Sequence, residues 1–467
     1  MSEDKMRNVP QNKSNTPAAR NVNRSASAGA RTGRPMRAAR APLGNKEENT
    51  KNKRNKAEAE KRSVPEKVKA LTKSEKKEIK NAEKDERWNE GIERVRSGHD
   101  WIFFIIVMLL ISLGTVMVYS ASYPSAIADG LGGFYYVGRQ LFWIGIGLIA
   151  MLFLSFAPYK WVKKAALPIF IVTIALLAAV PVIGKTVNGA KRWIQITSQI
   201  RIQPSEIAKL AIVIILAWYV SNNADSFKNV EDKKKSFING VFKPSIFIFL
   251  LAGLVLLEKH LSGALIIVLI GVILMFLAGA NWKLMLPYYM GIGGVSAALY
   301  LFIQPYAWQR VVTFFSSNAD KLDEDWQTYQ GTLAIGSGGF LGLGLGQSRQ
   351  KFSYVSEAQN DFIFTIWCEE MGFVGAIIVI LLFVALVFRG YKIALRAPDT
   401  FSSLLVFGII TQVGLQAFLN LMVVTDIIPN TGISLPFLSY GGSSLVMMMA
   451  EMGIVLSISR RSYQKIQ

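Results

Sequence analysis

Residues 101–120 read Trp-Ile-Phe-Phe-Ile-Ile-Val-Met-Leu-Leu-Ile-Ser-Leu-Gly-Thr-Val-Met-Val-Tyr-Ser, without one charged side chain. An α-helix of this length spans about 30 Å, the thickness of the hydrocarbon core of a bilayer. Hydrophobic residues make up 51% of the 467-residue chain, and similar stretches recur almost to its end. Because a water-soluble domain does not carry such a pattern, the sequence excludes a soluble enzyme.

We expect about ten membrane-spanning helices of this kind, so the predicted fold class is an all-α polytopic membrane protein. One connection is much longer than the others and joins the predicted seventh and eighth helices, over residues 304–360. A connection of that length is typical of a segment with order or function of its own. The predicted spans are residues 101–120, 138–157, 164–184, 205–220, 244–258, 262–279, 283–303, 361–388, 401–424 and 439–459.

The basic residues of the short loops predict the orientation of the chain in the membrane. Clusters at residues 160–164, 233–235, 389–396 and 460–461 all fall on the same side as the N-terminal tail. Cytoplasmic loops are the ones enriched in Lys and Arg. Both termini are therefore predicted to be cytoplasmic, and the long 304–360 loop is predicted to be external.

Residues 1–98 form a polar, basic tail. Residues 1–100 hold 26 Lys and Arg, half of the chain's 52, against only 15 Asp and Glu. Such a segment cannot bury a core, so we expect a disordered cytoplasmic tail that binds anionic membrane lipids. No aromatic or structural motif supports nucleic acid as a partner. Residues 99–467 are the predicted transmembrane domain, and its single cysteine, Cys368, excludes an intrachain disulfide.

Basic residues on the predicted external side need a reason, because translocated short loops are normally poor in them. Arg192 follows the third span, and Arg310 and Lys351 lie in the long loop. The same loop holds an acidic cluster of Asp320, Asp323, Glu324 and Asp325. Two interpretations remain open: contact with anionic headgroups, or an anionic, lipid-linked, phosphorylated substrate handled at the outer face.

Charged side chains within the predicted spans cost roughly 2.5–3.5 kcal/mol each, so they need partners. Glu206 and Lys209 share a face of the fourth helix and are predicted to form a structural polar pair. His260, in a short outer turn, is predicted to lie at headgroup level. Four further acids lie in or at the mouth of predicted spans, and two interpretations remain open for them: they line a polar cavity between helices, or they form a proton or ion pathway. The four are Asp361, Glu369, Glu370 and Glu451.

Two segments are rich in small residues. Gly336–Gly346 superficially resembles a phosphate loop, but no Gly-Lys-Ser/Thr follows and no βαβ unit surrounds it. We therefore predict a close-packed or re-entrant segment at the membrane surface. The segment Pro436-Phe-Leu-Ser-Tyr-Gly-Gly-Ser-Ser444 lies at the mouth of the last span. There Ser439, Gly441 and Ser443 are candidates to hold a substrate headgroup.

Six sequence blocks together resemble the SEDS family (shape, elongation, division and sporulation), of which FtsW and RodA are members, and the resemblance covers residues 101–460. One further block departs: where the family often has Gln/Glu-Pro-Asp-Leu-Gly-Thr, this chain has Glu258-Lys-His-Leu-Ser-Gly263. A role carried over from that aspartate is therefore in doubt. The six blocks are Asn188–Trp193, Gln203–Lys209, Gln309–Phe314, Ala334–Gly339, Glu357–Gly372 and Pro436–Ser444.

The resemblance implies a ten-helix glycosyltransferase of the bacterial cytoplasmic membrane. Such an enzyme polymerises lipid II into the β-1,4 glycan strands of peptidoglycan at the outer face, beside a class B penicillin-binding transpeptidase. The variant block and the long tail favour a division-type, FtsW-like member, working at the septum with other division proteins, over an elongation-type, RodA-like one. The alternative from another class is a lipid II flippase, which needs charges distributed through the membrane path instead of gathered at one face.

The resemblance also implies a catalytic site. The family's essential aspartate lies seven residues before the first glutamine of a Tyr-Gln-like segment, and counting back from Gln327 gives Asp320, with Asp323 and Asp325 as competing candidates. Asp320 would act as general base on the acceptor hydroxyl. A divalent cation, Mg or Mn, would have Asp320 as a possible ligand. The charge of the undecaprenyl pyrophosphate leaving group would be met by three cationic side chains: Arg192, Arg310 and Lys351.

Overall fold

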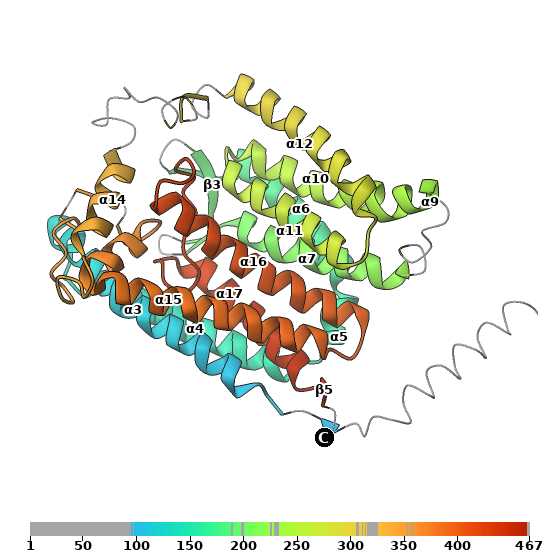
Figure 1. The fold of residues 1–467 in the computed structure, drawn as a ribbon, viewed down its shortest axis with the longest axis horizontal. Helices are drawn as coiled ribbons and strands as arrows, with labels where there is room; N and C mark the ends of the chain where they lie inside the picture. The colour runs from blue at the N-terminus through green and yellow to red at the C-terminus, as the bar shows by residue number, and fades with distance from the viewer. Residues whose placement is uncertain are drawn as a thin grey trace, which may run out of the picture. The chain divides into compact units, whose positions relative to one another are not determined.

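The computed structural model describes residues 95–96, 98–187, 190–197, 200–224, 227, 233–304, 308–310, 312, 314, 326–352, 354–355 and 358–464. These residues form a bundle of long helices with two small sheets (Figure 1). The predicted tail, residues 1–98, lies outside the described residues except for Val95, Arg96 and Gly98.

Ten long helices fall on the ten predicted spans, which confirms the all-α polytopic fold. In the described part of the chain, nine of these helices are long and apolar enough to cross a membrane, if Lys233–Leu257 is counted as one helix. The tenth, α11, is apolar but shorter. The ten are α3 (Trp101–Ala128), α4 (Tyr135–Phe156), α6 (Ala166–Ile183), α7 (Pro204–Asn222), α10 (Lys243–Leu257), α11 (Leu261–Leu277), α12 (Trp282–Ile303), α15 (Ile363–Leu395), α16 (Thr400–Val424) and α17 (Gly442–Ser459).

Shorter elements lie between these helices. α5 (Tyr159–Lys164) joins α4 to α6, and α9 (Lys233–Phe237) runs through a π-helix, η2 (Ile238–Phe242), into α10. α14 (Trp326–Ser337) lies within the long loop, so part of that loop has the order that its length predicts. α15 begins at Ile363, so Asp361 precedes the helix instead of sharing a helical face with Glu369.

The connection between α6 and α7 is a small antiparallel sheet that the sequence analysis did not predict. Its strands, in the order β2-β3-β4, are β2 (Lys185–Val187), β3 (Ala190–Gln195) and β4 (Arg201–Ile202). Ile194 pairs with Ile202 in this sheet. A separate ladder pairs β1 (Val95–Arg96) with β5 (Tyr463–Gln464), so the two ends of the described domain meet.

α7 is the centre of the bundle. It packs against α6, α10, α11 and α16, and most of its residues are buried. α12 lies at the periphery (Figure 1), with only Met285 and Tyr289 buried along its length. The apolar side chains that the bundle leaves exposed, such as Phe302 and Val295, suit contact with lipid tails.

The loops gather at the two ends of the bundle. At one end, which we call the loop end, Arg192 Nη2 donates to the carbonyl oxygen of Lys259, and the Ser262 hydroxyl donates to that of Thr431. At the other, the tail end, Arg389 lies 2.8 Å from Asp100. The side of the membrane that each end faces stays a prediction.

Candidate functional site

A buried ion pair lies near the loop end of α7. Lys209 Nζ is 2.8 Å from Glu206 Oε1, which is the contact that their spacing predicts. The same ammonium donates to Gln416 Oε1 on α16 at 2.7 Å, and all three side chains are buried. A charge in a dry interior needs such compensation. The pair therefore neutralises itself and links the central helix to α16.

α16 carries a row of three buried amides, spaced by four residues. They are not among the residues predicted from the sequence, although regularly spaced amides along an apolar helix are a signal that the sequence shows. Each donates from its nitrogen to a different neighbour: the first to both oxygens of Glu451 at 2.9 and 3.0 Å, the second to the carbonyl oxygen of Ser434 at 3.0 Å, and the third to that of Asp361 at 2.8 Å. The row consists of Gln412, Gln416 and Asn420.

The Glu206–Lys209 pair, the amide row of α16 and Glu451 lie along one polar path through the bundle. We call these residues the polar seam. The seam begins at Glu451, in the middle of α17, and ends at the loop end. Glu451 is therefore part of a polar, hydrogen-bonded lining between α7, α16 and α17. Of the two interpretations left open for it, the contacts describe the polar lining.

Lys351 is buried, and its ammonium group makes three contacts within the protein. Nζ lies 2.9 Å from Glu370 Oε1, 2.8 Å from the carbonyl oxygen of Gly346 and 3.0 Å from the hydroxyl of Ser120 on α3. A lysine ammonium has three donors, so these contacts use all of them. Lys351 thereby links residues 346–351 to α3 and α15, and its predicted contact with substrate charge stays a prediction.

Glu369 is held by the same segment. Its carboxylate accepts from the backbone N–H groups of Arg349 and Gln350 at 2.9 and 3.3 Å, and from the hydroxyl of Ser348. A buried carboxyl group needs such partners, because an unpaired polar group is costly where water is excluded. Glu369 and Glu370 thus fasten residues 346–351 to α15.

The glycine-rich segment crosses a break in α15. Gly372 has φ of 65° and interrupts the helix, and backbone groups of the segment replace the missing helical bonds. Leu343 N donates to the Glu369 carbonyl at 3.0 Å, and Phe373 N donates to the Gly339 carbonyl at 2.9 Å. A Cβ at Gly342 would lie 2.2 Å from the carbonyl oxygen of Glu370. The close-packed segment predicted from the sequence is therefore confirmed.

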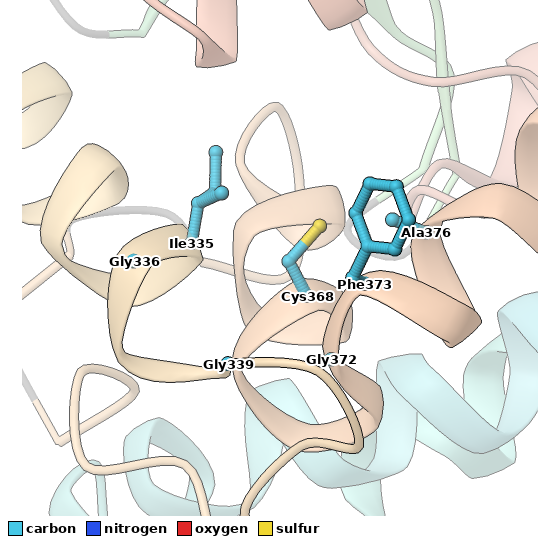
Figure 2. Close-up of a pocket in the computed structure, with 7 residues that line it drawn as sticks. All are labelled: Ile335, Gly336, Gly339, Cys368, Gly372, Phe373 and Ala376. Carbon is cyan, nitrogen blue, oxygen red and sulfur yellow. The ribbon is translucent and has the colours of Figure 1, made fainter.

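A groove of about 150 Å³ lies beside this break (Figure 2). Its walls are apolar: Ile335 comes from α14, and Cys368, Phe373 and Ala376 come from α15, with three glycines between them. The thiol of Cys368 is buried there. No acid or base for sugar chemistry lines the groove, so it is not a candidate reaction site.

Arg192 lies on β3 at the loop end, beside the turn that joins α10 to α11. Its Nη2 donates to the Lys259 carbonyl at 2.6 Å. In the same turn, His260 Nδ1 lies 3.2 Å from the hydroxyl of Ser205, at the start of α7. His260 is buried within the protein, which its place in a three-residue turn did not predict. Its expected depth at headgroup level stays a prediction.

Two groups of this turn have strongly shifted pKa values. Burial raises the pKa of Glu258 to about 8, although the positive charge of Arg192 acts in the opposite direction. Burial lowers the pKa of His260 to about 3, and the charges of Arg192 and Lys209 add to that effect. At neutral pH both side chains are therefore mainly uncharged beside the Arg192 cation.

Arg310 and Gln327 stand on either side of the predicted acidic cluster and converge on one residue. Arg310 Nη1 donates to the carbonyl oxygen of Asn430 at 2.7 Å, and Asn430 Nδ2 lies 3.4 Å from Gln327 Oε1. Asn430 belongs to the loop between α16 and α17, next to the end of the polar seam. Residues before and after the acidic segment are thus anchored at the same place.

The three small residues before and within α17 differ in their surroundings. Ser439 is buried, and its hydroxyl accepts from the Leu435 backbone N–H at 2.8 Å, so it closes a turn. Gly441 is the N-cap residue of α17. The hydroxyl of Ser443 has no hydrogen-bond partner among the residues that the structure describes. Ser443 is therefore the one of the three whose side chain has unused hydrogen-bonding capacity.

Asp320, Asp323, Glu324 and Asp325 lie outside the described residues, so their roles stay predictions. Within the described ranges, no group of three or more His, Cys, Asp and Glu side chains could hold a metal ion. A divalent cation at Asp320 would therefore take its remaining ligands from the substrate or from residues outside those ranges.

Comparisons with known proteins agree with one another. Residues 100–464 match the family FTSW_RODA_SPOVE, described as cell cycle protein. A probable peptidoglycan glycosyltransferase FtsW of Geobacter sp. (strain M18) is 37% identical over 367 residues, which cover 78% of this chain and 97% of the relative. Stage V sporulation protein E of Bacillus subtilis (strain 168) is 38% identical over 373 residues, covering 79% and 98%.

Two solved structures have the same fold. A chain of a peptidoglycan synthase complex, described as coordinating polymerization and crosslinking, aligns with a TM-score of 0.64 at 27% identity, over 78% of this chain and 98% of that one. The rod shape determining protein RodA of Thermus thermophilus aligns with a TM-score of 0.58 at 27% identity, again over 78% and 98%.

Proposed function

The chain belongs to the SEDS family of FtsW, RodA and SpoVE, and on that premise we propose that it is a peptidoglycan glycosyltransferase that polymerises lipid II into β-1,4-linked glycan strands. It is a multi-pass membrane protein of that family, and the proposed reaction takes place at the outer face of the cytoplasmic membrane. The observation that carries the proposal is the convergence of Arg310 and Gln327 on Asn430.

That convergence matters because the two residues bracket the acidic segment. A general base has to be held within hydrogen-bond reach of the hydroxyl that it activates. Arg310 and Gln327, the described residues on either side of that segment, both meet Asn430 close to the loop end of the polar seam. On this basis Asp320 is proposed as the base, with Asp323 and Asp325 as the competing candidates.

In the proposed mechanism, Asp320 accepts the proton of the acceptor's GlcNAc 4-hydroxyl as that oxygen attacks C1 of the donor's MurNAc. A positioned base typically contributes about 10²–10⁴-fold to such a step. Undecaprenyl pyrophosphate leaves as a stabilised anion, so a second carboxylic acid is not required. Direct inversion of the α-linked donor gives the β-1,4 product.

Cationic groups stabilise the leaving pyrophosphate in this scheme. Arg192 and Arg310 both lie at the loop end and are the side chains we assign to that role. We propose a structural role for Lys351, because its donors are used by Glu370, Gly346 and Ser120. A divalent cation such as Mg or Mn bound with Asp320 would supply further charge to the pyrophosphate.

The hydroxyl of Ser443 and the α17 N-terminus at Gly441 are proposed to hold the substrate headgroup. Backbone N–H groups at a helix N-terminus are suited to an anion, and the Ser443 hydroxyl has no hydrogen-bond partner among the described residues. Ser439 is proposed to support this region indirectly, because its hydroxyl accepts the hydrogen bond that closes the Leu435 turn before α17.

We further propose a role in cell division. The similar proteins named FtsW support that role, whereas the similarity to stage V sporulation protein E and RodA leaves sporulation and elongation as the alternatives. The solved synthase complex supports a class B penicillin-binding transpeptidase as partner. Location at the septum and contact with other division proteins follow from the proposed division role.

The second candidate function is a lipid II flippase. The polar seam favours it, because a transporter needs polar groups within the membrane and Glu451 lies in the middle of α17. The seam's side chains, however, are hydrogen-bonded between packed helices, and Arg192 and Arg310, the cations assigned to the pyrophosphate, both lie at the loop end. That distribution supports the polymerase.

The test is lipid II polymerisation by the purified protein with its cognate transpeptidase. We expect glycan strands, resolved as a ladder by gel electrophoresis. Absence of polymer together with lipid II flipping in proteoliposomes would contradict the glycosyltransferase and support the transporter.

A further inference from the structure

The apolar groove beside the break in α15 takes no part in the proposed reaction. Its base is formed by glycines: a Cβ added at Gly336 or at Gly339 would meet no neighbouring atom within 4 Å, and both residues are exposed. The Ile335 and Phe373 side chains lie on either side of the Cys368 thiol (Figure 2). The groove is therefore a hollow of about 150 Å³ that opens at the surface of the bundle.

The lining of the groove is suited to hydrocarbon. Among the described residues that form it, none carries a charged side chain, and the thiol of Cys368 is the one side-chain group other than hydrocarbon. Apolar cavities of about this size stay dry and bind apolar ligands. The chemistry of the lining therefore indicates a ligand that presents a hydrocarbon chain.

The length of α15 places the groove within the membrane. Residues Phe373–Phe388 carry no charged side chain, and a helix of that length spans about 24 Å. Arg389, which follows, is paired with Asp100 at the tail end. Because the hydrocarbon core is about 30 Å thick, Phe373 at the start of this run lies just inside the opposite edge of the core. The groove thus meets the part of a lipid chain that is close to the headgroup.

The groove also continues the exposed apolar surface of α15. Leu381 and Val384, further along the helix, are 59% and 58% exposed, as expected of side chains that contact lipid tails. At the groove, the ring of Phe340 is stacked against that of Phe373, with centroids 6.0 Å apart. Phe340 and Leu341 are 68% and 76% exposed. The apolar surface therefore extends from α15 onto the glycine-rich segment.

We propose that the groove is a phospholipid site, in which one acyl chain lies over Gly336 and Gly339, beside Phe373. The inference goes beyond the proposed function and does not depend on it. A chain bound there contacts α14 and α15 at once. It therefore stabilises the packing of the last part of the long loop against α15 and holds that part at the edge of the membrane.

Two other occupants fit the groove less well. A polyprenyl diphosphate has a charged end that needs cationic partners. The cations assigned to it, Arg192 and Arg310, are not part of the lining, and no described residue of the lining is cationic. A helix of a partner protein is about 10 Å across, too wide for a groove of about 150 Å³. A phospholipid needs only its chain in the groove, because its headgroup stays at the surface in contact with water.

The experiment is photo-crosslinking of the full-length protein in nanodiscs. The probe is a phosphatidylglycerol with a diazirine in the half of one acyl chain that is nearer the headgroup, and mass spectrometry locates the label. We expect label in the groove segments, residues 335–339 and 368–376, and on the lipid-facing residues 381–388. Gly336→Leu should lower the label in the groove segments at least about tenfold, since each CH₂ group that the new side chain displaces contributes about fourfold to binding. The label on residues 381–388 should not change.

The matched control is Ser337→Leu, which adds the same side chain at an exposed position of α14 outside the groove lining. It should be labelled like the wild type. Ala376→Leu fills the groove from α15 and should repeat the effect of Gly336→Leu, so the test survives if either variant does not fold.

Unchanged label in the groove segments of Gly336→Leu and Ala376→Leu would overturn the inference. Wild-type protein labelled on residues 381–388 but not in the groove segments would also overturn it. Two competitors test the occupant. Groove label that a polyprenyl diphosphate removes at lower concentration than unlabelled phosphatidylglycerol would assign the groove to the polyprenyl chain, and label that is lost on adding the transpeptidase would assign it to the partner protein. Either result would contradict a phospholipid site.

Discussion

At the scale of single residues, Lys209 shows how a charge is accommodated inside the bundle. Its ammonium is met by the Glu206 carboxylate at 2.8 Å and the Gln416 amide oxygen at 2.7 Å. Removing one member of a buried ion pair leaves the other charge without compensation, which typically costs about 3–5 kcal/mol. Replacing both members removes that penalty, so the pair should be more sensitive to single than to double changes.

We therefore predict that Lys209→Met lowers the thermal unfolding midpoint in detergent more than the double variant Glu206→Gln/Lys209→Met does. The single change leaves a buried carboxylate, whereas the double change leaves no charge. Unfolding is followed by intrinsic tryptophan fluorescence. A double variant that is less stable than the single one would show that the pair contributes net stability beyond charge compensation.

The sequence predicts some of these residue contacts and not others. Glu206 and Lys209 are three residues apart on one helix, so helical geometry alone brings them together. Lys351 was predicted as a cation that meets substrate charge, and its contact with Ser120, 231 positions away in the chain, was not predicted. No local pattern reveals such a contact. The burial of His260 was missed for the same reason, because its neighbour Ser205 lies 55 positions away in the chain.

At the scale of elements, the break in α15 explains why glycines recur in residues 336–346. Backbone groups of that segment and of α15 bond directly to each other, which leaves no room for side chains between them. Gly342 combines φ of 84° with a Cβ position 2.2 Å from the Glu370 carbonyl oxygen. Gly336, on α14, has open space around its Cβ position.

Gly342→Ala should therefore destabilise the protein by at least about 2 kcal/mol, because it combines left-handed backbone strain with a steric overlap against backbone. Gly336→Ala is the matched control and should be neutral or slightly stabilising, since alanine favours a helix. The measurement is the apparent melting temperature of each purified variant. Equal melting temperatures for the two variants would mean that the segment does not pack as the structure describes.

The ten spans were predictable because apolar runs of membrane length are a strong local signal. Their ends were less predictable: α3 continues to Ala128 and α15 to Leu395, beyond the predicted residues 120 and 388. These helix ends carry polar residues, such as Ser122 and Ser125 on α3 and Arg389 and Lys392 on α15, so hydropathy does not mark where the helices stop. The sheet between α6 and α7 has strands of two to six residues, too short for a periodic signal.

At the scale of the whole molecule, the proposed reaction at the outer face requires the loop end of the bundle to face outward. Arg192, Arg310 and the α17 N-terminus all lie at that end. The basic loops predict that the tail end is cytoplasmic. Lipid II polymerisation at the outer face is possible only with this orientation.

We predict the orientation to be visible by thiol labelling in a Cys368→Ala background, because Cys368 is the only native cysteine. A Lys185→Cys variant should react with a membrane-impermeant maleimide in intact cells, whereas a Lys164→Cys variant should react only after the cells are permeabilised. Both positions are exposed, so access alone does not separate them. The reverse labelling pattern would place the loop end inside and exclude the proposed mechanism.

The central claim is that this membrane bundle polymerises lipid II with Asp320 as the base. The most direct measurement compares glycan strand formation by the wild-type protein with that of Asp320→Ala and Asp323→Ala, each with the same transpeptidase partner and at matched folding by size-exclusion chromatography. We predict strands from the wild type and from Asp323→Ala, and a loss of about 10²-fold or more for Asp320→Ala. Undiminished polymer from Asp320→Ala would contradict the assignment of the base, and no polymer from the wild type would contradict the account as a whole.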